Sequence, residues 1–110
     1  MVLDVIINNV SVSVQIDKPF QPDLDAIHSQ VERFASSRGI DIADLDVKGL
    51  ILKMIRGIVG CERGCPANAK NLESTGHKGF EVRYVEGGIL TAHMLTAEGG
   101  TFDLKIFPDF

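Results

Sequence analysis

The sequence lacks the features that mark membrane proteins and nucleic-acid-binding proteins. No apolar run approaches the roughly 18–20 residues that a membrane-spanning helix needs. Basic residues are not in excess, because eleven Lys and Arg stand against fifteen Asp and Glu, a net charge of −4. Nucleic acids and anionic membranes bind basic surfaces, so we expect neither of them as a partner.

The chain also lacks a secretory signal and any sign of a second domain. It starts Met1-Val2-Leu3-Asp4, with no basic stretch and an early acidic residue, so we expect a cytoplasmic protein. There is no repeat, linker or low-complexity tract. A length of 110 residues is typical of one domain, and we expect a single domain over 1–110.

Motifs for independent catalysis are missing as well. The sequence has no nucleophile elbow for serine catalysis. It has no glycine-rich phosphate loop, and the acidic residues at 41, 44 and 46 are spaced as helix caps and solvated surface. With no complete catalytic constellation, the sequence favours a non-catalytic protein.

What is present at the start of the chain is a β-hairpin pattern. Residues 2–16 alternate around Asn8-Asn9, a pair that tolerates the positive φ of a two-residue turn. This turn pairs Ile7 with Val10 and places the apolar residues of both strands on one face. The face consists of Leu3, Val5, Ile7, Val10, Val12 and Val14.

Two helices follow, each predicted by an apolar stripe of helical spacing. The first starts near Asp23 and ends at Gly39, with the stripe Leu24, Ile27, Val31 and Phe34. Asp41 and Asp44 are candidate caps for the second. Its wider stripe is Val47, Leu50, Ile51, Met54, Ile55 and Ile58.

Residues 80–107 predict a three-stranded meander with two-residue turns at Gly87-Gly88 and Gly99-Gly100. In that register His93 lies on the core face between Val82 and Ile106. The opposite face is a candidate dimer or partner surface, formed by Val85, Leu90, Ala92, Met94 and Phe107.

The predicted fold is therefore α+β, in the order ββ-ααα-βββ. About five antiparallel strands form the sheet, as an N-terminal hairpin plus a C-terminal three-stranded meander. Two to three helices pack on one face of this sheet.

The most distinctive motif is Cys61-x3-Cys65-Pro66, which contains both cysteines of the chain. Pro66 suits the first position of a short third helix that ends toward Gly76. Cys65 would then lie at a helix N-terminus, where the helix dipole lowers the pKa of a thiol. We interpret Cys65 as a reactive or ligating thiol, with Cys61 as resolving thiol or second ligand.

The same motif raises a metal hypothesis. Cys61 to Pro66 resembles the last two ligand positions of the bacterial ferredoxin signature, C-x2-C-x2-C-x3-C-P. The first two cysteines of that signature have no counterpart, so an iron–sulfur cluster would need two chains or other ligands. A zinc site of Cys61, Cys65, His77 and His93 has suitable ligand chemistry, although its spacing fits no standard zinc finger.

Two further interpretations of this segment stay open, one functional and one structural. The free amides after Cys65 suggest an anion site of Arg63, Ala67, Asn68 and Ala69. In the structural alternative, Cys61 packs as a small apolar residue and Cys65 only caps a helix, with no cofactor.

The histidines divide between core and surface. His93, predicted in the core, needs a partner such as a backbone carbonyl or one of the thiols. We expect His77 to be a solvent-exposed loop residue and His28 to border the apolar stripe of the first helix.

Two functions follow from these patterns. The first is a small accessory protein for thiol redox or metal handling at Cys61 and Cys65. The alternative is a protein-interaction module or homodimer with structural cysteines, in contact through its sheet surface.

Overall fold

A computed structural model describes residues 1–59, 77, 79–85 and 88–107 of the chain. The elements in chain order are β1 (Val2–Ile7), β2 (Val10–Gln15), α1 (Leu24–Ser37), α2 (Val47–Val59), β3 (Glu81–Val85), β4 (Ile89–Leu95) and β5 (Thr101–Phe107). The five strands form one antiparallel sheet in the order β2-β1-β5-β4-β3. The predicted α+β class is confirmed, and the predicted third helix lies outside the described residues.

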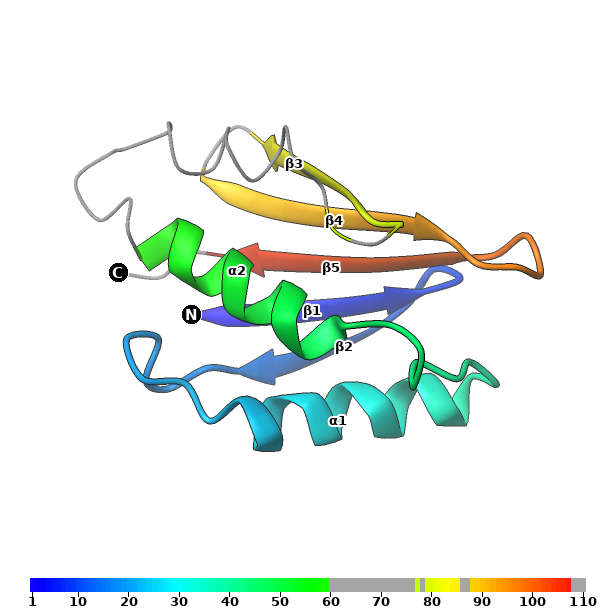
Figure 1. Ribbon diagram of the computed structural model, residues 1–110, viewed down its shortest axis with the longest axis horizontal. Helices are drawn as coiled ribbons and strands as arrows, with labels where there is room; N and C mark the ends of the chain where they lie inside the picture. Colours follow the sequence, from blue (N-terminus) through cyan, green and yellow to red (C-terminus); the bar gives the residue numbers. More distant parts are fainter. Residues whose placement is uncertain (60–76, 78, 86–87, 108–110) are drawn as a thin grey trace.

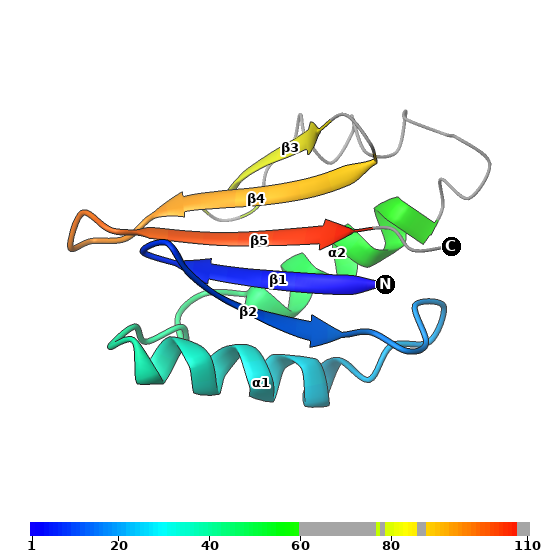
Figure 2. The same ribbon diagram turned by 180° about the vertical axis from the view of Figure 1, so that it is seen from behind.

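The molecule has two layers, a sheet and a pair of helices. Helix α2 crosses in front of the central strands in Figure 1 and behind them in Figure 2, whereas α1 runs alongside β2 in both views. Both helices and all five strands contribute to one buried apolar core. Neither helix described is long and apolar enough to cross a membrane.

The N-terminal hairpin forms as predicted. Asn8 and Asn9 have φ of +50° and +68°, as a two-residue hairpin turn requires. Ile7 pairs with Val10, and the register continues to Leu3 opposite Val14. The side chains of Leu3 and Ile7 are fully buried, so this register places the apolar face of β1 in the core.

The two described helices also follow the predicted stripes. Asp23 caps α1 by accepting a hydrogen bond from Ala26 N at 3.1 Å. All six predicted apolar positions of α2 are buried. The predicted caps of α2 are wrong, however, because Asp46 takes that role by accepting from Gly49 N at 3.1 Å.

The register of the C-terminal meander differs from the prediction. Val85 pairs with Ile89, and Leu95 pairs with Thr101. This register differs by an odd number of residues from the register that a two-residue turn at each glycine pair would produce. The glycines at 88 and 99 instead adopt φ of +85° and +84°, which is typical of three-residue hairpin loops ending in a left-handed residue.

This shift turns β4 over relative to its predicted orientation, because side chains alternate between the two faces of a strand. Leu90 and Ala92, predicted on the outer face, are fully buried. His93, predicted in the core, lies on the outer face with 42% of its side chain exposed. Of the predicted partner surface, only Val85 and Phe107 remain on the outer face, since Met94 packs against the core.

Candidate binding pocket

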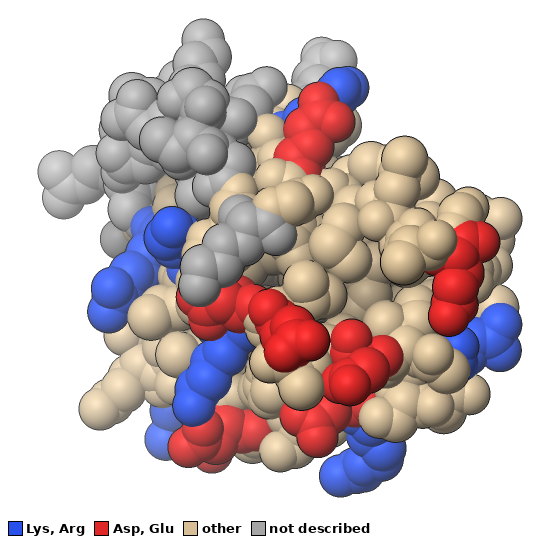
Figure 3. All heavy atoms as spheres, turned by 45° about the vertical axis from the view of Figure 1, so that its right-hand side comes forward, with Lys and Arg blue, Asp and Glu red and all other residues tan. Residues whose placement is uncertain are grey.

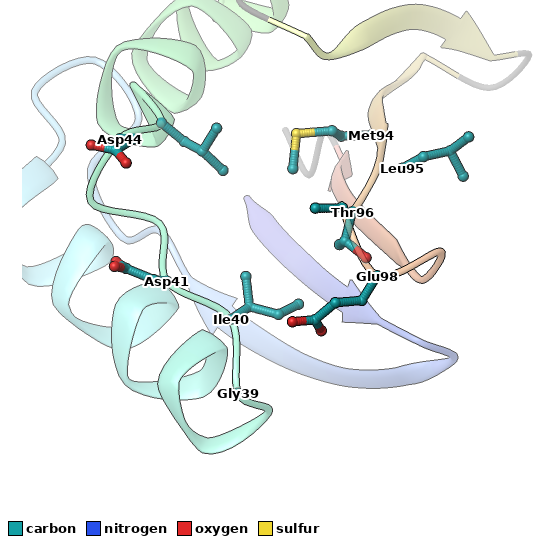
Figure 4. Close-up of a pocket in the computed structure, with 10 residues that line it drawn as sticks. Gly39, Ile40, Asp41, Asp44, Met94, Leu95, Thr96 and Glu98 are labelled. Carbon is teal, nitrogen blue, oxygen red and sulfur yellow. The ribbon is translucent and has the colours of Figure 1, made fainter.

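A pocket of about 310 Å³ opens between the α1–α2 connection and the loop that joins β4 to β5. We call it the end pocket, because it lies beside the loop at one end of β4 and β5 (Figures 1 and 4). Its walls come from two segments that are far apart in the sequence. The lining residues are Gly39, Ile40, Asp41, Asp44, Leu45, Met94, Leu95, Thr96, Ala97 and Glu98.

The interior of the end pocket is apolar. Ile40 from the helix connection and Met94 from β4 point into it from opposite sides (Figure 4). These two side chains and Leu45 pack against the core while remaining partly exposed. Methionine is flexible and polarisable, so Met94 gives the pocket a wall that can adapt to different apolar side chains.

The rim of the end pocket is acidic. Asp41 and Asp44 lie on the helix connection, and Glu98 reaches across the opening from the β4–β5 loop toward Ile40 (Figure 4). No lysine or arginine is among the described residues that line the pocket. In Figure 3, acidic side chains stand on both sides of a hollow in this part of the surface.

Local hydrogen bonds hold both walls of the end pocket. On the hairpin side, Thr96 N donates to Gly100 O at 2.9 Å, and Gly100 N donates to Thr96 Oγ1 at 2.9 Å. On the helix side, Ile40 N donates to Ala35 O at 2.9 Å, directly after Gly39 leaves the helix with φ of +77°. Each wall is therefore held by hydrogen bonds within its own segment of the chain.

The outer face of the sheet carries a histidine–carboxylate pair. His93 Nδ1 lies 2.5 Å from Asp103 Oδ1. The carboxylate oxygen accepts this hydrogen bond from Nδ1. Glu81 lies opposite His93 in the register of the neighbouring strand β3. The histidine–carboxylate pair does not line the end pocket, so it is not part of that site.

His77 lies on the other side of the sheet, against α2. Its side chain is only 6% exposed, so the prediction of a solvent-exposed loop residue is wrong. Nε2 donates to the Asp46 carbonyl oxygen at 3.1 Å, and Nδ1 accepts from Lys53 Nζ at 3.1 Å. The structure does not bring His77 and His93 together, because they lie on opposite faces of the sheet.

The other predicted site residues can be placed only in part. The proposed thiol, metal and anion residues Cys61, Arg63, Cys65, Ala67, Asn68 and Ala69 lie outside the described residues, so their roles stay predictions. Among the described residues, no group of three or more potential metal ligands is present. His28 borders the buried face of α1 as expected, with Nδ1 at 3.7 Å from Glu32 Oε2.

Sequence reasoning missed the end pocket. In the sequence, Asp41 and Asp44 are candidate helix caps and Glu98 only precedes the glycine pair Gly99-Gly100, so each of these residues has a local interpretation. No spacing in the sequence links the helix connection to the β4–β5 loop, because the two meet only when the helices pack on the sheet. The length of that loop was the one signal that could have helped.

Comparison of the chain with known proteins found no matching family model, no similar curated protein and no similar solved structure.

Proposed function

We propose that this chain is a protein-interaction module that binds an exposed apolar side chain of a partner protein in the end pocket. The supporting observation is the apolar interior formed by Ile40, Leu45 and Met94 at an opening in the surface. Binding sites are typically concave and mostly apolar, with a few polar groups at defined positions. The end pocket has this composition.

The proposal keeps the second function predicted from the sequence but moves its contact surface. The outer face of the sheet is a weaker candidate because its central rows are polar. One row runs from Arg83 through Thr91 and Lys105 to Asp4 across four strands. Such a face is typical of an antiparallel sheet that is solvated on one side.

The three methionines of the chain serve as probes of the pocket, because only one of them lines it. Met94 lines the end pocket, whereas Met1 and Met54 are buried in the core at 5% and 0% exposure. Protein labelled with 13C at the methionine methyl groups gives three signals. The signal that is missing in Met94→Leu belongs to Met94. The probes are twelve-residue peptides selected from a random display library on the immobilised chain.

We expect the selected peptides to shift the Met94 methyl signal and to leave the signals of Met1 and Met54 in place. The two core methyl groups serve as internal controls for a general change in packing. Peptides that bind without moving Met94 would show that the contact surface lies elsewhere. A library that enriches no peptide would also contradict the proposal.

Thiol redox or metal handling at Cys61 and Cys65 is a separate proposal with its own test. The metal-to-chain ratio of protein purified without oxygen is measured, together with its oxidant sensitivity, for the wild type and Cys61→Ser/Cys65→Ser. Iron or zinc at about half to one equivalent, lost in the double variant, would support a metal site. Unchanged metal content and oxidant sensitivity in the double variant would leave the cysteines a structural role.

A further inference from the structure

We infer that the partner segment carries a lysine or arginine next to the apolar side chain that enters the end pocket, and that Glu98 binds this basic group. The inference rests on the proposed function and specifies the partner's chemistry. The occupant is a short extended segment of another protein. Three features of the pocket support it: the position of Glu98, the charge of the rim and the shape of the interior.

Glu98 is placed to bind a cation at the opening. Its loop position is exposed, and its side chain extends across the opening toward Ile40 (Figure 4). Among the described residues it makes no ion pair and no side-chain hydrogen bond. The carboxylate can therefore accept from a partner without breaking a contact within the chain.

The remaining charge of the rim has the same sign. Asp41 and Asp44 lie on the opposite wall, and Asp41 Oδ1 is occupied by Ala43 N at 2.9 Å. Charges that line one pocket act together on a group bound in it, more strongly at low salt, because salt screens them over about 10 Å at 0.1 M. No described lysine or arginine in the lining offsets them, so an acidic segment is repelled and a basic one is attracted.

The shape of the pocket suits the amphipathic side chains of lysine and arginine. Their aliphatic stems pack on apolar surface while the charged group stays at the water boundary. In the end pocket the stem would lie along Ile40 and Met94, with the charged group at Glu98. An apolar neighbour in the segment fills the interior beside Leu45.

The experiment uses the same selected peptides and a matched pair of variants. Glu98→Gln removes the rim charge, and Glu32→Gln makes the same change on the exposed surface of α1, away from the pocket. We expect the selected peptides to contain Lys or Arg beside an apolar residue. Replacing this basic residue of the peptide with Gln should weaken binding about fivefold, and Glu98→Gln in the protein should have the same effect. Glu32→Gln should leave the affinity unchanged.

Coupling between the two changes identifies the contact. The Gln-substituted peptide should lose no further affinity on Glu98→Gln, because the interaction is already absent. Wild-type binding should also weaken with added salt more steeply than binding to Glu98→Gln.

The inference and the proposed function fail in different ways. Peptides that shift Met94 but lack a basic residue, or that bind Glu98→Gln as tightly as wild type, would overturn the inference alone. Peptides that leave Met94 unmoved would overturn the proposed function. Self-association of the wild type that shifts Met94 at increasing concentration would identify a second copy as occupant, and that too would overturn the inference.

Discussion

The orientation of β4 can be tested with two substitutions at neighbouring positions, Ala92→Asp and His93→Ala. Ala92 is fully buried in a core whose described residues are all apolar, so Ala92→Asp places a carboxylate among apolar side chains. Leaving an uncompensated buried charge costs about 3–5 kcal/mol. The whole domain is expected to have a stability of about 5–15 kcal/mol, so this variant should lose a large fraction of it.

His93→Ala should have a small effect. The His93 side chain is 42% exposed, and that of its partner Asp103 is 22% exposed. A histidine–carboxylate pair this accessible to solvent contributes at most about 1 kcal/mol. The two adjacent positions are therefore expected to differ by about 2 kcal/mol or more in the free energy of unfolding.

The assay is urea unfolding followed by far-UV circular dichroism, with the m-value checked for two-state behaviour. Should Ala92→Asp not fold, Ala92→Ser introduces a smaller polar group and should still cost about 1–3 kcal/mol. The reasoning is refuted if His93→Ala costs more than Ala92→Ser, since that order belongs to the opposite orientation of β4.

Three other predictions concern contacts that hold the fold together. Lys48 donates to Asp25 and lowers the pKa of that carboxyl. Lys48→Met should therefore be less stable than the wild type at neutral pH, and this difference in the free energy of unfolding should vanish as the pH falls from about 4 through the lowered pKa, as measured by unfolding at several pH values. Gly100→Ala should cost about 1 kcal/mol in urea unfolding, because its Cβ would clash with the Asn8 Oδ1 atom that accepts a backbone hydrogen bond; an unchanged midpoint would contradict this. His77→Ala should cost about 2 kcal/mol, because its nearly buried ring makes hydrogen bonds to Lys53 of α2 and to the carbonyl of Asp46 just before that helix; a loss in thermal unfolding as small as that of an exposed position would contradict this.

Charge and exposure separate the two candidate sites on this molecule. The outer face has a histidine–carboxylate pair but a polar, solvated surface around it. The end pocket has an apolar interior, and Glu98 at its rim has no partner among the described residues. A binding role fits the second better, because concave apolar surface is what excludes water from a contact.

The amino-acid sequence determined the parts of the fold that depend on local periodicity. The Asn8-Asn9 turn sets the hairpin register, because both residues adopt positive φ and the flanking valines alternate. The apolar stripes of α1 and α2 identify the buried face of each helix. These features are predictable because each depends on residues within a few positions of one another.

Tertiary structure decided which way β4 faces and where a binding pocket forms. Gly-Gly is compatible with both two-residue and three-residue loops, and an odd change in loop length reverses every side chain of the next strand. Burial of Leu90 and Ala92 selects between the two registers only when the whole sheet packs against the helices. For the same reason Glu98 and Ile40 meet at one pocket, since only the packing of the two layers brings their segments together.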